Sequence, residues 1–324
     1  FYGIPSKHVE EITVDVKWTE VPKTANWLLG LINLRGNIIS LLDFGNLLNL
    51  KDDVQEVEEL CYNNTIIVTT DKDKVALAKM ISLVENNIIE SWDIISKLQS
   101  DSPPKNSYVI GITGSSGVGK STFISRLVQL FVESEEKIGI ILIDPSSPFS
   151  GGAFLGDRIR MFELSKFSNV YIRSVASRGA LGGLCNSIYD IIDIMKSFGF
   201  DKIIVETVGA GQTETEIFYA CDSVILILSP DSGDEVQIFK AGIMEIADCY
   251  VVNKIDLPSS KKFMVQMENF INSEKNIQKK LFGVSALENK GLDKIKTWIE
   301  LQQKEEKENT PKKEIRRKIR VKNY

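Results

Sequence analysis

The chain has 324 residues, of which 43% are hydrophobic and 26% are charged. These proportions are typical of a soluble globular protein and exclude a disordered or collagen-like chain. No apolar run approaches the ~20 residues of a membrane-spanning helix. The net charge of −5 gives no general attraction to nucleic acid. The length predicts two domains or one large one.

The few cysteines and histidines limit the metal chemistry of the chain. Four cysteines are scattered without a CxxC pair, and His8 is the single histidine. We therefore expect reduced thiols in a cytoplasmic protein, and no zinc or nickel site built from His and Cys. The sequence has no signal peptide and starts with Phe1, so we expect a fragment that begins inside a longer protein.

Residues 1–98 contain short β-rich segments, which predict a small antiparallel barrel domain. The predicted strands cover residues 12–16, 27–34, 37–42, 65–69 and 75–83. Residues 99–106 follow with the sequence QSDSPPKN, whose Pro-Pro pair predicts a linker between two domains.

Residues 107–303 alternate between apolar strands and amphipathic helices, a pattern that predicts βαβ units. The predicted strands are 108–112, 138–143, 170–173, 202–205, 223–228, 249–252 and 281–284, and the predicted helices are 120–131, 187–197, 235–246, 261–272 and 292–302. The expected fold class is α/β, a parallel sheet with helices on both faces. Residues 304–324 form a basic tail, interpreted as a solvated helix, with binding to nucleic acid or anionic lipid as the alternative.

The sequence GSSGVGKS at residues 114–121 is the strongest chemical signal. It fits G-x-x-x-x-G-K-[ST] between a predicted strand and a predicted helix, the context of a phosphate-binding P-loop. Its glycines let backbone N–H groups surround phosphates, Lys120 reaches the β- and γ-phosphates, and Ser121 ligates Mg²⁺. We expect nucleotide contacts from Gly114, Gly117, Val118, Gly119, Lys120, Ser121 and Thr122.

An N-K-x-D sequence, Asn253, Lys254 and Asp256, follows an apolar strand about 130 residues later. A buried aspartate carboxylate there accepts hydrogen bonds from the N1–H and N2–H₂ groups of guanine, which adenine cannot supply. The tripeptide Ser285, Ala286 and Leu287 follows the next strand and predicts a loop that covers the base. The combination favours GTP and GDP over ATP.

Acidic residues follow the predicted strands on the P-loop side, where Mg²⁺ would lie. Asp144 and Glu206 end two strands, and Asp157 lies in a glycine-rich segment. Glu206 with Gly209 has the form of a γ-phosphate sensor, and Lys120, Glu206, Gly209 and Lys240 are the predicted catalytic residues. The predicted metal ligands are Ser121, Asp144, Asp157 and Glu206.

The position after Gly209 holds Ala210, so the glutamine that orients water in fast GTPases is absent there. Gln212 is nearby, and Lys240, Arg158 or Arg178 would supply positive charge to the transition state. We expect slow intrinsic GTP hydrolysis that a partner accelerates.

Several longer stretches resemble the MeaB/ArgK family of P-loop GTPases over about residues 107–302. They are DPSSPFSGGAFLGDRIRM at 144–161, RGALGG at 178–183, ETVGAGQ at 206–212, SGDEVQ at 232–237 and KAGIMEIAD at 240–248. The resemblance implies a G-protein chaperone of a B12-dependent acyl-CoA mutase, chiefly methylmalonyl-CoA mutase. It also implies a partner-facing third switch at residues 231–240. Family members form homodimers through a carboxy-terminal arm, of which residues 304–324 would be the truncated start.

Residues 1–98 are similar to a different family, the CheW-like domains of bacterial chemotaxis. The specific element is NLRG at residues 33–36, preceded by YGIP at 2–5. The resemblance implies a non-enzymatic barrel, truncated at its amino-terminal end, that binds a chemotaxis receptor or histidine kinase, with Arg35 facing the partner. The other interpretation of NLRG is a tight hairpin turn with a solvated arginine.

Three other functions compete with the mutase chaperone. The first is a signalling scaffold in which the GTPase half regulates docking. A kinase for amino-acid transport components is disfavoured by N-K-x-D, which argues against ATP. A nickel-delivery GTPase is disfavoured because the chain lacks His and Cys ligands.

Overall fold

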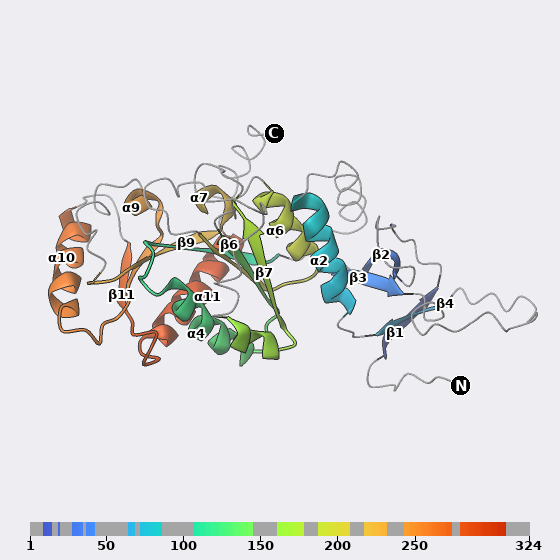
Figure 1. Cartoon of the computed structure of the whole chain (residues 1–324), viewed down its shortest axis with the longest axis horizontal. Helices are drawn as coiled ribbons and strands as arrows, with labels where there is room; N and C mark the ends of the chain where they lie inside the picture. The colour runs from blue at the N-terminus through green and yellow to red at the C-terminus, as the bar shows by residue number, and fades with distance from the viewer. Residues whose placement is uncertain are drawn as a thin grey trace, which may run out of the picture. The chain divides into compact units, whose positions relative to one another are not determined.

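The computed structural model describes residues 9–14, 19, 28–34, 37–42, 64–68, 72–85, 106–144, 161–177, 187–207, 217–231, 243–273 and 279–308. The chain divides into two compact units, Phe1–Asn106 with Asp190–Gly199, and Ser107–Tyr189 with Phe200–Tyr324. Figure 1 labels most of the helices and strands of both units.

The first unit contains two antiparallel strand pairs among its described residues. Strand β1 (Val9–Val14) pairs with β4 (Asn64–Val68), and β2 (Leu28–Leu34) pairs with β3 (Asn37–Leu42). The register of the second pair sets Leu34 opposite Asn37. These four strands lie within one or two residues of the predicted ones, apart from β1, which begins earlier. A closed barrel remains a prediction.

The predicted strand at residues 75–83 is wrong, because this segment belongs to the helix α2 (Lys72–Glu85). Its buried side chains include Leu77, Met80, Ile81 and Val84. Their spacing of three, one and three residues places all four on one face of a helix, whereas a strand would divide them between two faces. The apolar residues of this segment therefore follow the helical period.

The second unit is built on a seven-stranded sheet in the order β11-β10-β9-β5-β8-β6-β7, in which every pair is parallel. Its strands are β5 (Tyr108–Thr113), β6 (Ile138–Asp144), β7 (Val170–Ala176), β8 (Lys202–Glu206), β9 (Ser223–Leu228), β10 (Cys249–Val252) and β11 (Lys280–Gly283). All seven match predicted strands, and the parallel sheet confirms the α/β fold class.

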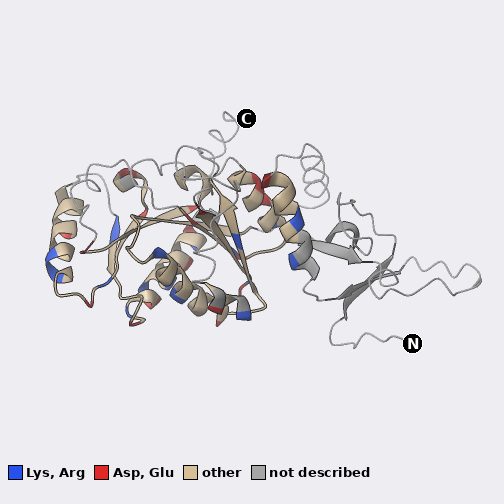
Figure 2. Cartoon of the chain, in the orientation of Figure 1, with Lys and Arg blue, Asp and Glu red and all other residues tan. Residues whose placement is uncertain are grey.

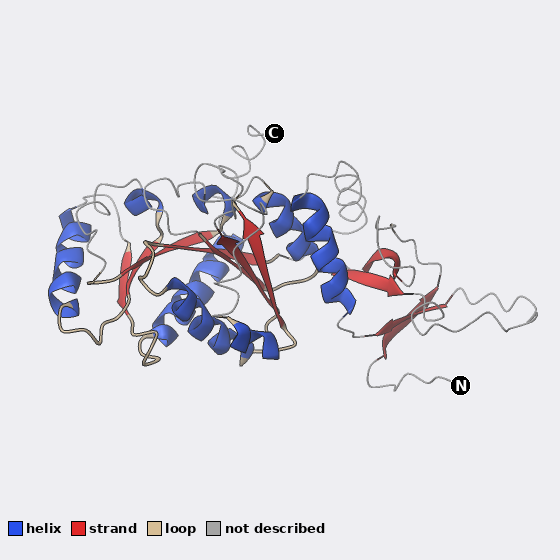
Figure 3. Ribbon diagram, in the orientation of Figure 1, coloured by secondary structure: helices blue, strands red, loops and turns tan. Residues whose placement is uncertain are grey.

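Helices lie along both faces of this sheet, as Figure 3 shows. The described helices of the segments that alternate with its strands are α4 (Lys120–Val132), the 3₁₀ turn η2 (Phe162–Lys166), α6 (Ile188–Ser197), α7 (Ile217–Ala220), α9 (Ile243–Ile246), α10 (Ser260–Ser273) and α11 (Leu292–Glu308). Of the predicted helix 235–246, residues 235–242 lie outside the described residues. Among the described helices, none combines the length and apolar character needed to cross a bilayer.

Alternate residues of the strands pack on opposite faces of the sheet, which explains their near-continuous apolar sequences. On β9, Ile225 and Ile227 join the core under α4 and α11, while Leu226 and Leu228 join a second cluster with α9 and α10. Charged residues are concentrated on helices and loops, and most of the sheet is uncharged (Figure 2). A chain buried on both faces in this way can present polar groups only at the ends of its strands.

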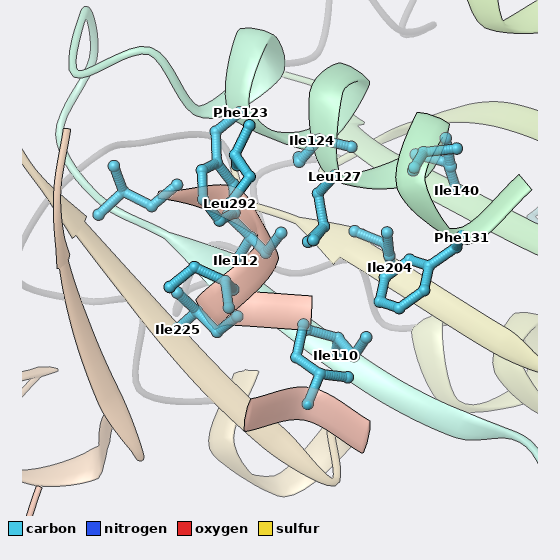
Figure 4. Packing of buried hydrophobic residues seen from close by; sticks show 14 of the residues in the cluster. Ile110, Ile112, Phe123, Ile124, Leu127, Phe131, Ile140, Ile204, Ile225 and Leu292 are labelled. Carbon is cyan, nitrogen blue, oxygen red and sulfur yellow. The ribbon is translucent and has the colours of Figure 1, made fainter. Parts of the chain in front are cut away.

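The larger core cluster lies between the sheet and helices α4 and α11 (Figure 4). Helix α4 contributes the buried residues Phe123, Ile124, Leu127, Val128 and Phe131. Trp298 of α11 is 8% exposed in the same cluster and lies edge-on to Phe282 of β11. This packing fixes the start of α4, and with it the loop that precedes the helix.

Leu127→Ala should lower the free energy of unfolding by about 2–5 kcal/mol, because Leu127 is fully buried and its loss leaves a cavity. Leu301→Ala is the matched control, since Leu301 on α11 is 52% exposed and should change stability by less than about 0.5 kcal/mol. Urea unfolding followed by circular dichroism compares the two variants. Equal midpoints would contradict the packing assigned to α4.

Candidate functional site

A cleft of about 320 Å³ opens at the carboxyl end of the sheet, where ligands bind in open α/β folds. The loop after β5, the start of α4 and the ends of β6 and β8 supply most of its lining. The lining residues are Ser116, Gly117, Gly119, Lys120, Ser121, Thr122, Leu142, Ile143, Asp144, Glu206, Thr207 and Lys254. The structure therefore brings together predicted residues from four separate sequence segments.

The predicted phosphate loop runs from the end of β5 to the start of α4, and its glycines adopt backbone conformations that L-residues avoid. Gly114, Gly117 and Gly119 have φ values of 143°, 82° and 92°. A Cβ on Gly119 would lie 2.5 Å from Nδ2 of Asn253, whereas a Cβ on Gly117 would meet nothing within 4 Å. The loop thus needs glycine for backbone conformation at both positions, and also for close approach at Gly119.

Lys120 is folded over this loop. Its Nζ donates hydrogen bonds to the carbonyl oxygens of Gly114 at 2.8 Å and Ser115 at 3.3 Å, and the residue is 8% exposed. A nearly buried ammonium at the amino-terminal end of a 13-residue helix is strongly attractive to anions. This is the predicted position for a phosphate-binding lysine.

Three predicted metal-binding side chains converge on the cleft. The Ser121 hydroxyl donates to Oε1 of Glu206 at 3.1 Å, and Asp144 ends β6 in the same lining. Asp144 is 2% exposed and Glu206 6%. A hydroxyl and two carboxylates are hard oxygen ligands that fit Mg²⁺. The described residues contain no cluster of three His, Cys, Asp or Glu, so nucleotide oxygens and water would complete such a site.

Asn253 connects the phosphate loop to the loop after β11. Its Nδ2 donates to the carbonyl of Val118 at 2.9 Å, and its Oδ1 accepts from the backbone N–H of Ala286 at 3.1 Å. Both ends of the amide are used within the protein, and the residue is 3% exposed. Asn253 therefore positions the two loops, while its predicted contact with a nucleotide stays a prediction.

Asp256 and Ser285, which the sequence predicts to recognise the base, lie in contact with each other. The Ser285 hydroxyl donates to Oδ1 of Asp256 at 2.6 Å. Ser285 and Ala286 are buried, while Leu287 is 76% exposed, as a side chain that covers a ligand would be. The predicted burial of the Asp256 carboxylate is wrong, because Asp256 is exposed in the loop between β10 and α10. Only a bound base would remove it from water.

The guanine preference should be constant between about pH 5 and pH 8. The pKa of Asp256 lies below its ordinary value of 3.8, chiefly because the Ser285 hydroxyl donates to the carboxylate. A lowered pKa keeps the charge, and with it the hydrogen bonds to a base, until the pH falls through that lowered value. The ratio of the dissociation constants for ADP and GDP, measured across this range, tests the expectation. A tenfold fall in the ratio towards pH 5 would contradict it.

Three predicted site residues, Asp157, Gly209 and Lys240, lie outside the described residues, as do Arg158, Arg178 and Gln212. Four lining residues were not predicted, namely Ser116, Leu142, Ile143 and Thr207. Ser116 lines the cleft, and Thr207 donates from its hydroxyl to Thr113 at 3.1 Å and from its N–H to Ile112. Ser116 and Thr207 lie inside the sequences GSSGVGKS and ETVGAGQ, and Leu142 and Ile143 directly precede the predicted Asp144.

A family model described as "Methylmalonyl Co-A mutase-associated GTPase MeaB" matches residues 77–324, which is more than half of the chain. The chain belongs to the MeaB family. A model of the CheW-like domain matches residues 1–134. The MeaB match contains the whole cleft as well as Asp256 and Ser285, and the two matches overlap over residues 77–134.

Two of the three curated relatives described here carry GTPase names. The GTPase ArgK of Escherichia coli is 33% identical over 232 residues, which cover 69% of this chain and 70% of the relative. A putative GTPase of Pyrococcus abyssi is 47% identical over 184 residues, 57% of this chain and 56% of the relative. The "Methylmalonic aciduria type A homolog, mitochondrial" of Caenorhabditis briggsae is 34% identical over 74% of this chain and 63% of its own. The chain thus spans just over half the length of the Pyrococcus abyssi relative.

A solved structure shows the same fold. The crystal structure titled "LAO/AO transport system kinase" superposes with a TM-score of 0.60 over 77% of each chain, at 24% sequence identity. This likeness supports the fold of the MeaB unit and the arrangement of its sheet.

Proposed function

We propose that the chain binds Mg·GTP in the cleft and hydrolyses it to GDP and phosphate. The observation that carries the proposal is the Ser121–Glu206 hydrogen bond at the floor of the cleft. It joins the metal-binding residue of the phosphate loop to the acid that ends β8. Membership of the MeaB family supports the same activity.

Different residues would bind the phosphates, the metal ion and the base of the substrate. The backbone of the phosphate loop and Lys120 would hold the β- and γ-phosphates, and Ser121, Asp144 and Glu206 would hold Mg²⁺ directly or through water. When bound, the ion neutralises charge on the phosphate oxygens. Asp256 would accept from guanine N1–H and N2–H₂, with the Ser285–Leu287 loop over the base.

Hydrolysis adds water to the γ-phosphorus and breaks its bond to the bridging oxygen, giving GDP, phosphate and a proton. Glu206 would fix the metal-bound water, and Gly209 would donate its N–H to the γ-phosphate. Lys240 and Asp157 are further candidates. With Ala210 after Gly209, intrinsic turnover would be slow, on the order of 10⁻³ to 10⁻² per second.

A phosphate-release assay on the whole chain tests this function. We expect slow release from GTP that needs Mg²⁺, and release from ATP at least tenfold slower. Glu206→Gln should reduce release about 100-fold, because the amide carries no charge for the metal. Turnover of several per second without a partner would contradict the slow mechanism, and an absence of any GTP-dependent release would contradict the function.

A B12-dependent acyl-CoA mutase of the methylmalonyl-CoA type is the partner that the family suggests. We infer that the chain uses GTP to gate cofactor loading of such a mutase, in the cytoplasm, and that homodimerisation would need more of the carboxy-terminal arm. The test is whether a methylmalonyl-CoA mutase co-purifies with the chain and accelerates phosphate release. No acceleration at saturating mutase would contradict this partner.

The CheW-like match supports a second candidate, a chemotaxis-type scaffold that the GTPase half regulates. Residues 1–98 would then bind a receptor or histidine kinase, with residues 99–106 as a linker. Capture of a chemotaxis receptor–kinase complex by the chain, but not by Arg35→Ala, would favour this function over the mutase chaperone.

A further inference from the structure

An ion pair joins the N-K-x-D sequence to the loop that follows β9. Lys254 Nζ lies 2.9 Å and 3.2 Å from the two carboxylate oxygens of Asp231, and it also donates to the carbonyl of Gly117 at 2.9 Å. The side chains of Lys254 and Asp231 are 31% and 46% exposed. The Lys254 ammonium is thus held between the phosphate loop and a carboxylate.

The backbone of Lys254 is arranged for this contact. Its φ of 59° is unusual for a residue with a long side chain and carries a conformational cost. Backbone hydrogen bonds on both sides retain it, from Asn253 N–H to Leu228, from Ile255 N–H to Val284 and from Leu257 N–H to Lys254 itself. The conformation directs the side chain across to the phosphate loop, where it lines the cleft.

Asp231 is also held in place by a hydrogen bond that does not involve Lys254. The Ser229 hydroxyl, from a fully buried residue, donates to the same carboxylate. This hydrogen bond, followed by the contact with Lys254, lowers the pKa of Asp231. Asp231 is not among the residues that line the cleft, whereas Lys254, which its carboxylate contacts, is one of them.

We propose that Asp231 is a positioning residue for guanine binding. It holds the Lys254 ammonium over the phosphate loop, so that the aliphatic stem of Lys254 forms a fixed wall beside the base held by Asp256. Without the Asp231 carboxylate, the Lys254 ammonium is hydrated by water instead, and the aliphatic stem of Lys254 is no longer held in place. Binding of the base must then order this stem, and the entropic cost lowers the affinity. This inference rests on the proposed function and names a residue that sets its base affinity.

The test measures GDP and ADP binding to the whole chain, with Mg²⁺, by calorimetry. Asp231→Asn should weaken GDP about threefold to fivefold, as expected for a half-exposed ion pair, and leave ADP unchanged. Asp231→Glu, which keeps the charge, should restore most of the affinity. Glu300→Gln removes a similarly exposed acid, paired with Lys296 on α11, and should leave both affinities unchanged.

Salt gives a second readout, because high salt screens an exposed pair. The difference between wild type and Asp231→Asn should shrink in about 1 M salt, where the screening length is about 3 Å. Equal losses for GDP and ADP, or unchanged GDP binding in Asp231→Asn, would overturn the inference alone. Wild-type protein that does not prefer GDP to ADP would overturn the proposed function and this inference together.

Discussion

Lys120→Ala should abolish measurable GTP binding, with a loss of about 100-fold or more in affinity. The Lys120 ammonium is 8% exposed and lies against the carbonyls of Gly114 and Ser115. In this nearly water-free position a charge-assisted hydrogen bond to each of two phosphates contributes about 1.5–3 kcal/mol. The free energy lost with both hydrogen bonds exceeds the ~1.4 kcal/mol that corresponds to a tenfold change in affinity. Titration with a fluorescent GTP analogue in the presence of Mg²⁺ measures the loss of affinity.

Lys262→Ala is the matched control for charge, because Lys262 lies exposed on α10 and away from the cleft lining. It should bind GTP as wild type does. Lys120→Met keeps the aliphatic stem and should also fail to bind, while its thermal unfolding stays close to that of the wild type. Binding by Lys120→Met within threefold of wild type would contradict the role of the ammonium.

Asp256→Asn should exchange the preferred base. Guanine offers two donors, N1–H and N2–H₂, and an asparagine amide has a single acceptor oxygen, so its NH₂ group would face a donor. We expect GTP to bind about 100-fold more weakly, near the ~2–3 kcal/mol of an unmatched polar contact. Xanthosine triphosphate has a carbonyl in place of N2–H₂, and it should bind the variant more tightly than the wild type.

The xanthine nucleotide serves as the internal control for folding, because a variant that binds it retains its phosphate site. Competition of GTP, xanthosine triphosphate and ATP against one fluorescent probe compares all three. An unchanged order of affinity in Asp256→Asn would place base recognition elsewhere. Weaker binding of all three by one common factor would assign Asp256 a structural role only.

Apolar runs in the sequence were sufficient to predict the strands of the parallel sheet. A segment such as 223–228 is buried on both faces, so its composition alone identifies it. The secondary structure of residues 75–83 was harder to predict, because a short run of β-branched and apolar residues fits either a helix or a strand. The spacing of Leu77, Met80 and Ile81 is what distinguishes the two. The strand order is set by long-range pairing, which no local pattern contains.

The site was predictable where one motif supplies several residues. The phosphate loop, Asp144 and Glu206 meet at one edge because parallel strands end together. The exposure of Asp256 and the bracing role of Asn253 depend on how three loops pack, and neither follows from the N-K-x-D sequence. The pairing of Lys254 with Asp231 spans 23 positions, and its cause is the adjacency of β9 and β10 in the sheet.

The central claim, a guanine nucleotide site, is tested most directly by displacement of fluorescent GDP from the whole chain in Mg²⁺. We expect GTP to displace the probe at a concentration about 100-fold lower than ATP, because two hydrogen bonds to the Asp256 carboxylate distinguish the bases. Displacement by ATP and GTP at equal concentrations would contradict the claim.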